Sequence, residues 1–126
     1  MSEGLNRVTL IGNLGQDPNL RHTEGGQGVL NIRMATTETY MTRDRELQER
    51  TEWHSVVMWG RRGEALAKIL TKGSRICVEG RLQTRVWEGE DGSNRYTTEV
   101  VATNILLLGS RANGNNKDEQ RSREAN

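Results

Sequence analysis

The chain has few of the residues that build covalent or metal-bound scaffolds. Its 126 residues include one cysteine, Cys77, and two histidines, His22 and His54. A lone cysteine cannot form an internal disulfide, and a zinc site made of cysteine and histidine ligands is excluded. We therefore expect a protein of a reducing compartment, without a metal or other cofactor, in which Cys77 is a small buried apolar residue.

Long apolar segments are also missing. Even the run Ile105–Leu108 is far shorter than the roughly 20 apolar residues of a membrane-spanning helix. Residues Met1–Asn6 lack the apolar segment of a secretory signal peptide. We expect a soluble protein of the cytoplasm.

Neither sign of charge dominates, and no group of residues is typical of an enzyme. The 18 Lys and Arg residues nearly balance the 17 Asp and Glu residues, so any cationic site must come from local arrangement. The glycine cluster at Gly25–Gly28 lacks the Lys-Ser/Thr pair of a phosphate-binding loop, and no HExxH motif is present. We expect no catalysis; the enzymatic alternative is a nuclease that uses scattered Asp, Glu and Arg side chains.

Alternation of apolar and polar residues predicts five long strands. They are expected at Leu5–Leu14, Val29–Tyr40, Thr51–Gly60, Arg75–Trp87 and Tyr96–Leu108. A helix is expected between the third and fourth strands, where Leu66 and Leu70 recur at helical spacing before a stop at Lys72-Gly73. This order predicts an all-β OB-fold, a five-stranded Greek-key barrel with one helix between strands 3 and 4.

The remaining segments are expected to be loops and one tail. Gly15–Gly28 holds the only proline and predicts a loop or short hairpin, and the polar segment Met41–Arg50 predicts an exposed hairpin tip. From residue 110 onward no apolar periodicity remains. We expect one folded domain at residues 1–109 and a disordered polar tail at 110–126.

The aromatic residues are scarce but strongly biased, with three Trp, two Tyr and no Phe. Trp53 and Trp59 share one side of the third strand, about 20 Å apart at roughly 3.3 Å per residue. Trp87 lies in a row with Arg81, Gln83 and Arg85, a composition that suits a single-stranded nucleic acid, because bases stack on rings and cations contact phosphates.

Tyr40 is a fourth candidate ring, although strict alternation puts it in phase with the apolar residues Ile32 and Met34 unless the strand contains a bulge. The tryptophans have an alternative role as fillers of a core or of a subunit interface. His54 lies on the opposite side of the third strand from Trp53 and Trp59, which favours a core or interface histidine over a catalytic one.

Several motifs in order resemble those of the bacterial single-stranded DNA-binding protein family. They are Asn6–Pro18, Thr51–Gly60, Lys72–Ser74, Val78–Leu82, Thr84–Trp87 and Arg95–Val101. The resemblance implies an OB-fold that assembles as a homotetramer, binds single-stranded DNA in the nucleoid, and protects it during replication, recombination and repair.

The resemblance also implies roles for individual residues. The stacking rings correspond to Tyr40, Trp53, Trp59 and Trp87, the basic contacts to Arg7, Arg21, Arg43, Arg61, Lys72 and Arg85, and the subunit-interface histidine to His54. The family often has Trp at the place of Tyr40 and Phe at that of Trp59, and both exchanges keep a ring face. Family members typically end in an acidic tip that closes in Pro-Phe, which this sequence lacks. We therefore expect recruitment of replication and repair proteins through such a tip to be lost.

Overall fold

A single, strongly curved β-sheet forms most of the computed structural model, which describes residues 2–110. The elements are β1 (Val8–Leu14), β2 (Asn19–His22), β3 (Gly28–Met41), β4 (Leu47–Trp59), α1 (Arg61–Ala67), β5 (Ser74–Glu88) and β6 (Asn94–Ser110). None of the described residues forms a helix long and apolar enough to cross a membrane.

Five of the strands close into a barrel. The sheet order is β1-β5-β6-β4-β3-β2. Strand β1 also pairs with β3 through Asn13↔Ala35 and Leu14↔Met34. This pairing joins the two edge strands of the sheet β1-β5-β6-β4-β3 and closes it into a barrel. All these pairings are antiparallel except that of β4 with β6. The short strand β2 adds to the outer edge of β3. A five-stranded barrel with one helix between β4 and β5 is the predicted OB-fold.

The core fills the barrel with alternate residues of the long strands. Leu30, Ile32 and Met34 of β3 lie opposite Met58, Val56 and His54 of β4. The other buried apolar residues of this cluster are Leu14, Leu70, Ile76, Val78, Val100, Ala102 and Ile105. Because side chains alternate across a strand, burial of this row turns the intervening residues of β3 and β4 outward.

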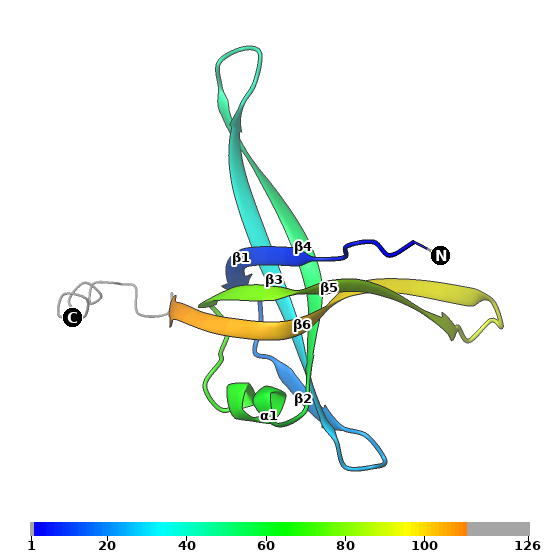
Figure 1. Ribbon diagram of the computed structural model, residues 1–126. Coiled ribbons are helices and arrows are strands. Elements are labelled where there is room, and N and C mark those ends of the chain that lie inside the picture. The colour runs from blue at the N-terminus through cyan, green and yellow to red at the C-terminus, as the bar shows by residue number, and fades with distance from the viewer. Residues whose placement is uncertain (1, 111–126) are drawn as a thin grey trace.

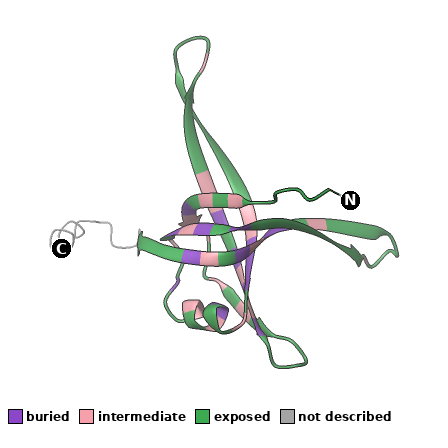
Figure 2. Ribbon diagram, in the orientation of Figure 1, coloured by how far each residue is buried: buried purple, intermediate pink, exposed green. Residues whose placement is uncertain are grey.

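Three antiparallel hairpins extend beyond the barrel (Figure 1). The β3–β4 hairpin extends farthest to the top of the view, the β5–β6 hairpin points to the right, and the β2–β3 hairpin points downward. Figure 2 shows that the outer parts of these arms are almost entirely exposed. Hence the core sits where the arms meet, and the arms present exposed, backbone-paired surfaces around it.

Several boundaries differ from the predicted ones; the first strand, for example, begins at Val8 rather than at Leu5. Within Gly15–Gly28, where a loop or short hairpin is predicted, β2 pairs with the start of β3 as a hairpin. Strand β4 starts at Leu47 rather than Thr51, because backbone pairing with β3 requires no apolar pattern. The helix ends at Ala67, not near Gly73, and the N–H groups of both Ile69 and Leu70 bond to the carbonyl of Leu66.

The predicted domain boundary is close to the end of the described residues. Strand β6 reaches Ser110. The rest of the predicted tail, residues 111–126, lies outside the described residues.

Candidate nucleic-acid interface

The structure decides which side of β4 faces outward. Val56 and Met58 are buried in the barrel, whereas Trp53 and Trp59, on the other side of the strand, are 50% and 45% exposed. The pattern of the sequence left this choice open. Both tryptophans therefore offer ring surface to solvent from the same side of one strand.

A polar groove lies between these tryptophans and the β5–β6 hairpin. On β3 and β4 it is lined by Asn31 and Arg33, paired with Val57 and Ser55, which stand between Trp53 and Trp59 along the outer face. Its remaining wall residues are Gln16, Asn19, Arg21, Ile32, Val56, Arg85, Thr97 and Glu99. We call this the outer groove; three arginines and one glutamate give it a net positive lining.

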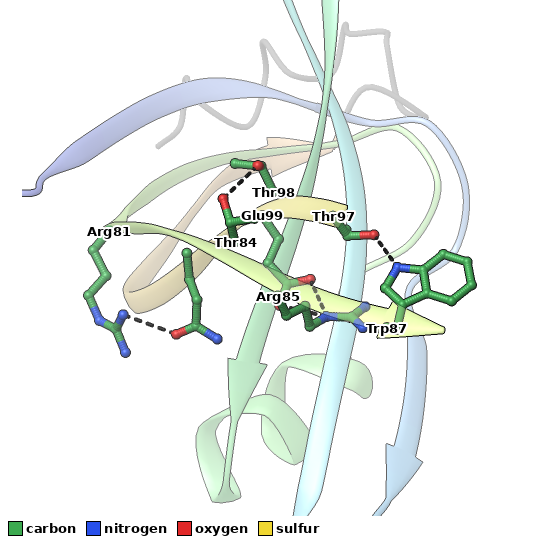
Figure 3. Close-up of polar contacts among 8 residues, drawn as sticks. Arg81, Thr84, Arg85, Trp87, Thr97, Thr98 and Glu99 are labelled. Atoms are coloured by element: carbon green, nitrogen blue, oxygen red, sulfur yellow. Dashed lines mark hydrogen bonds and ion pairs between the residues drawn. The ribbon is translucent and has the colours of Figure 1, made fainter. Parts of the chain in front are cut away.

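The β5–β6 hairpin holds its groove-side residues by cross-strand hydrogen bonds (Figure 3). The indole Nε1 of Trp87 donates to Thr97 Oγ1 at 2.9 Å, which fixes one edge of a ring that is 44% exposed. Arg85 Nε lies 3.3 Å from both carboxylate oxygens of Glu99. The Glu99 side chain is only 7% exposed and that of Arg85 54%, so a nearly buried carboxylate holds Arg85 at the groove and offsets part of its charge.

Three of the four candidate rings lie beneath a guanidinium group. The Cζ atoms of Arg33, Arg50 and Arg95 lie 5.3, 4.6 and 5.9 Å from the ring centroids of Trp53, Tyr40 and Trp87, respectively. All three distances fall within the range of a cation–π contact. The candidate stacking surfaces are thus also arginine-binding surfaces of the free chain.

Tyr40 lies on the opposite face of the β3–β4 ribbon from Trp53. The register runs without a shift from Val29↔Trp59 to Met41↔Leu47, so no bulge changes the phase of Tyr40 relative to Met34. The ring is 40% exposed because β3 has left the barrel at this point. Tyr40 therefore does not line the outer groove, and a strand contacting it must pass along the β3–β4 arm.

The predicted cations are spread over the molecule. Only Arg21 and Arg85 line the outer groove. Arg7 precedes β1, Arg43 lies in the turn between β3 and β4, Arg61 begins α1 beside His22 and Glu64, and Lys72 lies in the turn before β5. The backbone N–H of Lys72 donates to Asp17 Oδ1 at 2.8 Å.

His54 lies on the inner side of β4, opposite to the tryptophans, as the sequence predicts. Its Nε2 lies 2.9 Å from the hydroxyl of Thr36, and the residue is half-buried within the single chain. Its role at a subunit interface stays a prediction.

Sequence reasoning did not single out Arg33 or Glu99. Arg33 stands between the apolar residues Ile32 and Met34 in the sequence, and this alternation indicates that its side chain points away from the core. Its position over Trp53 depends on the β3–β4 register. The burial of Glu99 depends on β5–β6 pairing and left no signal in the sequence.

At the tip of the β5–β6 hairpin one carboxyl group has a shifted pKa. The Ser93 hydroxyl donates to Asp91 Oδ1 at 2.7 Å and the Ser93 N–H donates to the same oxygen at 3.0 Å, and these bonds lower the pKa of Asp91.

No three His, Cys, Asp or Glu side chains among residues 2–110 are grouped so that they could hold a metal ion.

Comparison with known proteins assigns the chain to a family. The sequence pattern of the single-strand binding protein family matches residues 5–108. The chain belongs to the single-strand binding protein family. Over 115 residues it is 45% identical to single-stranded DNA-binding protein 1 of Chlorobaculum tepidum, covering 90% of this chain and 71% of the relative. Over 114 residues it is 43% identical to the single-stranded DNA-binding protein of Xylella fastidiosa, covering 90% and 70%.

Two solved structures of the same family share the fold of this chain. The Plasmodium falciparum SSB complex with ssDNA aligns with a TM-score of 0.76 at 32% identity, over 86% of this chain and 98% of that one. A deletion mutant of the single-stranded DNA binding protein from Thermus aquaticus aligns with a TM-score of 0.77 at 35% identity, over 89% and 54%. The predicted family and OB-fold are therefore confirmed for this member.

Proposed function

We propose that this protein binds single-stranded DNA without reading its sequence and protects it during replication, recombination and repair. The observation that carries the proposal is the pair Trp53 and Trp59, half-exposed on one side of β4. Between them on the same strand lie Ser55 and Val57, which line the arginine-bearing outer groove. Membership of a family whose relatives are named as single-stranded DNA-binding proteins supports it. These relatives are named as binding proteins, and we assign no catalysis to this chain.

Stacking and charge supply the binding energy in this mechanism. Base stacking on an aromatic side chain is worth about 1–3 kcal/mol per base and is tolerant of sequence, because every base has a ring face. We assign this role to Trp53, Trp59, Trp87 and Tyr40. Arg and Lys side chains contact the phosphates, so log affinity should fall with log salt by about 0.7 per neutralised phosphate.

The positions of the proposed contacts favour a strand that wraps over several faces of the molecule. The phosphate contacts we propose are Arg7, Arg21, Arg43, Arg61, Lys72 and Arg85. They lie on all three hairpin arms, on the helix, just before β1 and in the turn before β5. A DNA strand in the outer groove alone would miss most of them. We place the protein on DNA in the nucleoid of the cytoplasm.

We further propose a homotetramer with His54 at a subunit interface. Ile11 on β1 and Leu106 on β6 flank Cys77 in one row across the sheet, and the first two are 48% and 54% exposed. Among the described residues, Val8–Gly12 pair only with β5, which leaves a strand edge open for another copy. Sedimentation equilibrium tests this: a mass of four chains supports it, and a monomer at micromolar concentration contradicts it.

Intrinsic tryptophan fluorescence, titrated with oligo-dT at low and high salt, tests the DNA-binding proposal. Deep quenching that saturates at a fixed number of nucleotides is expected, because stacked bases quench exposed indoles. Trp53→Ala and Trp59→Ala should each weaken binding by about 1–3 kcal/mol. Unchanged fluorescence with the wild-type chain at both salt concentrations would overturn the proposal.

Three alternatives have separate tests. If the tryptophans fill subunit contacts instead, Trp87→Ala should dissociate the oligomer without weakening DNA binding. If the physiological ligand is RNA, ribo-homopolymers should bind at least as tightly as deoxy-homopolymers of the same length at one salt concentration. Incubation of labelled single-stranded DNA with Mg²⁺ tests the nuclease alternative, and we expect the strand to be recovered intact.

A further inference from the structure

An arginine side chain lies over each of the rings of Trp53, Tyr40 and Trp87. Each comes from the strand that pairs with the strand carrying its ring. Arg95 stands directly opposite Trp87, and Arg33 pairs with Ser55, which is two residues from Trp53. The β3–β4 and β5–β6 ladders thus bring a guanidinium to the ring in both arms.

A covered ring face cannot hold a base at the same time. A base that stacks on the Trp53 face under Arg33 must move the guanidinium aside. The displaced guanidinium keeps its charge and stays beside the strand, whose phosphates follow every stacked base. We propose that Arg33, Arg50 and Arg95 cover their rings in the free protein and move from ring to phosphate when a base stacks. This inference rests on the proposed function and adds three DNA contacts to it.

Arg33 offers the strongest case of the three. It lines the outer groove and its side chain is exposed, with the small residue Ser55 opposite it. Within residues 2–110 no carboxylate lies within ion-pair distance of Arg33 or Arg50, whereas Arg95 is 3.6 Å from Asp91. Because Glu99 already pairs with Arg85, Arg33 supplies charge in the groove that no described carboxylate offsets.

The chemistry of the guanidinium group suits a cover that can be displaced. A guanidinium is weakly hydrated and stacks on aromatic faces, so it shields the indole from water without a permanent bond. Trp59, which has no such cation among the described residues, provides an internal comparison.

The salt dependence of oligo-dT binding by the whole protein tests the proposal. Arg33→Gln should reduce the slope of log affinity against log salt by about 0.7, the value of one lost phosphate contact on a single strand. Arg33→Lys should restore the slope, because it keeps the charge. Arg62→Gln is the matched control, because Arg62 donates to Thr103 O and Asn104 Oδ1 outside the groove. The salt slope measured with Arg62→Gln should equal that of the wild type.

A second measurement does not depend on DNA-binding constants. In the free protein, NMR should find the Arg33 side-chain protons shifted upfield by the ring current of Trp53, and Trp53→Ala or saturating oligo-dT should remove the shift. A slope for Arg33→Gln equal to that of the wild type, or an unshifted Arg33 in the free protein, would overturn the inference. If the wild-type chain binds oligo-dT but either of these two outcomes is found, the proposed function stands and only the inference about the arginines is wrong. If the wild-type chain does not bind oligo-dT, the proposed function and the inference are both wrong.

Discussion

Gly15 lies directly against the six-membered ring of Trp53. A Cβ atom at this glycine would stand 2.6 Å from Cη2 of the indole and closer still to Cζ3, and no other residue type fits unless the ring moves. The N–H of Gly15 also donates to the carbonyl of Arg33 at 2.9 Å, so the backbone here is fixed from two sides. The loop after β1 therefore positions the Trp53 ring of β4, although the two segments are far apart in the sequence.

Gly15→Ala should displace the Trp53 ring and weaken single-stranded DNA binding, by no more than the loss from Trp53→Ala. The reason is steric, because the added methyl group would overlap the atoms of the ring. Since the backbone of Gly15 is held by its hydrogen bond to Arg33, the ring has to move instead. Oligo-dT titration and the emission wavelength of the free protein measure the effect. Gly25→Ala is a suitable control, because a Cβ there has only the Thr23 hydroxyl nearby, at 3.9 Å. Equal binding by Gly15→Ala and wild type would contradict this account.

Glu99→Gln should tighten DNA binding at low salt. The substitution removes the carboxylate that pairs with Arg85 and offsets its charge in the outer groove, while the size of the side chain is kept. Because the gain is electrostatic, it should shrink as salt is raised. Binding isotherms at three salt concentrations measure it. Weaker binding by Glu99→Gln at every salt concentration would mean that positioning of Arg85 matters more than its free charge.

Ile76→Ala should lower the free energy of unfolding by about 2–5 kcal/mol, the cost of a large-to-small substitution in a packed core. The Ile76 side chain is completely buried within the barrel. Denaturant unfolding at a fixed protein concentration measures the loss, and DNA affinity under native conditions should change little. A loss below about 1 kcal/mol would show that the barrel collapses around the cavity.

Ser93→Ala should raise the pKa of Asp91 toward the ordinary value of an aspartate. The Ser93 hydroxyl is the main group that lowers this pKa, followed by the Ser93 N–H, which the substitution leaves in place. Because the pKa is depressed in the folded chain, the bonds to Asp91 order the hairpin tip at neutral pH and are lost as the pH falls through that lowered value. An NMR titration of the Asp91 side chain follows the change. An identical pKa in the two proteins would assign the shift to the groups that remain around Asp91, chiefly the Ser93 N–H.

The sequence by itself determined the architecture. Period-two alternation in the long strands and the helical spacing of Leu66 and Leu70 define the order of elements, because burial of one face imposes a pattern on every strand that crosses the core. That pattern ends where the strands leave the barrel. The extension of β4 back to Leu47 and the short strand β2 are held by backbone pairing, which leaves little trace in residue type.

The sequence also identified the tryptophans and their neighbours along the chain, since Trp53 and Trp59 share a side of any regular strand. Only the tertiary structure decided that this side faces outward, that Arg33 covers one ring and Gly15 abuts it, and that Glu99 is buried beneath Arg85. Those contacts join residues up to 38 positions apart, as with Gly15 and Trp53. Strand register and barrel closure bring such residues together, and neither is encoded in the spacing of any single segment.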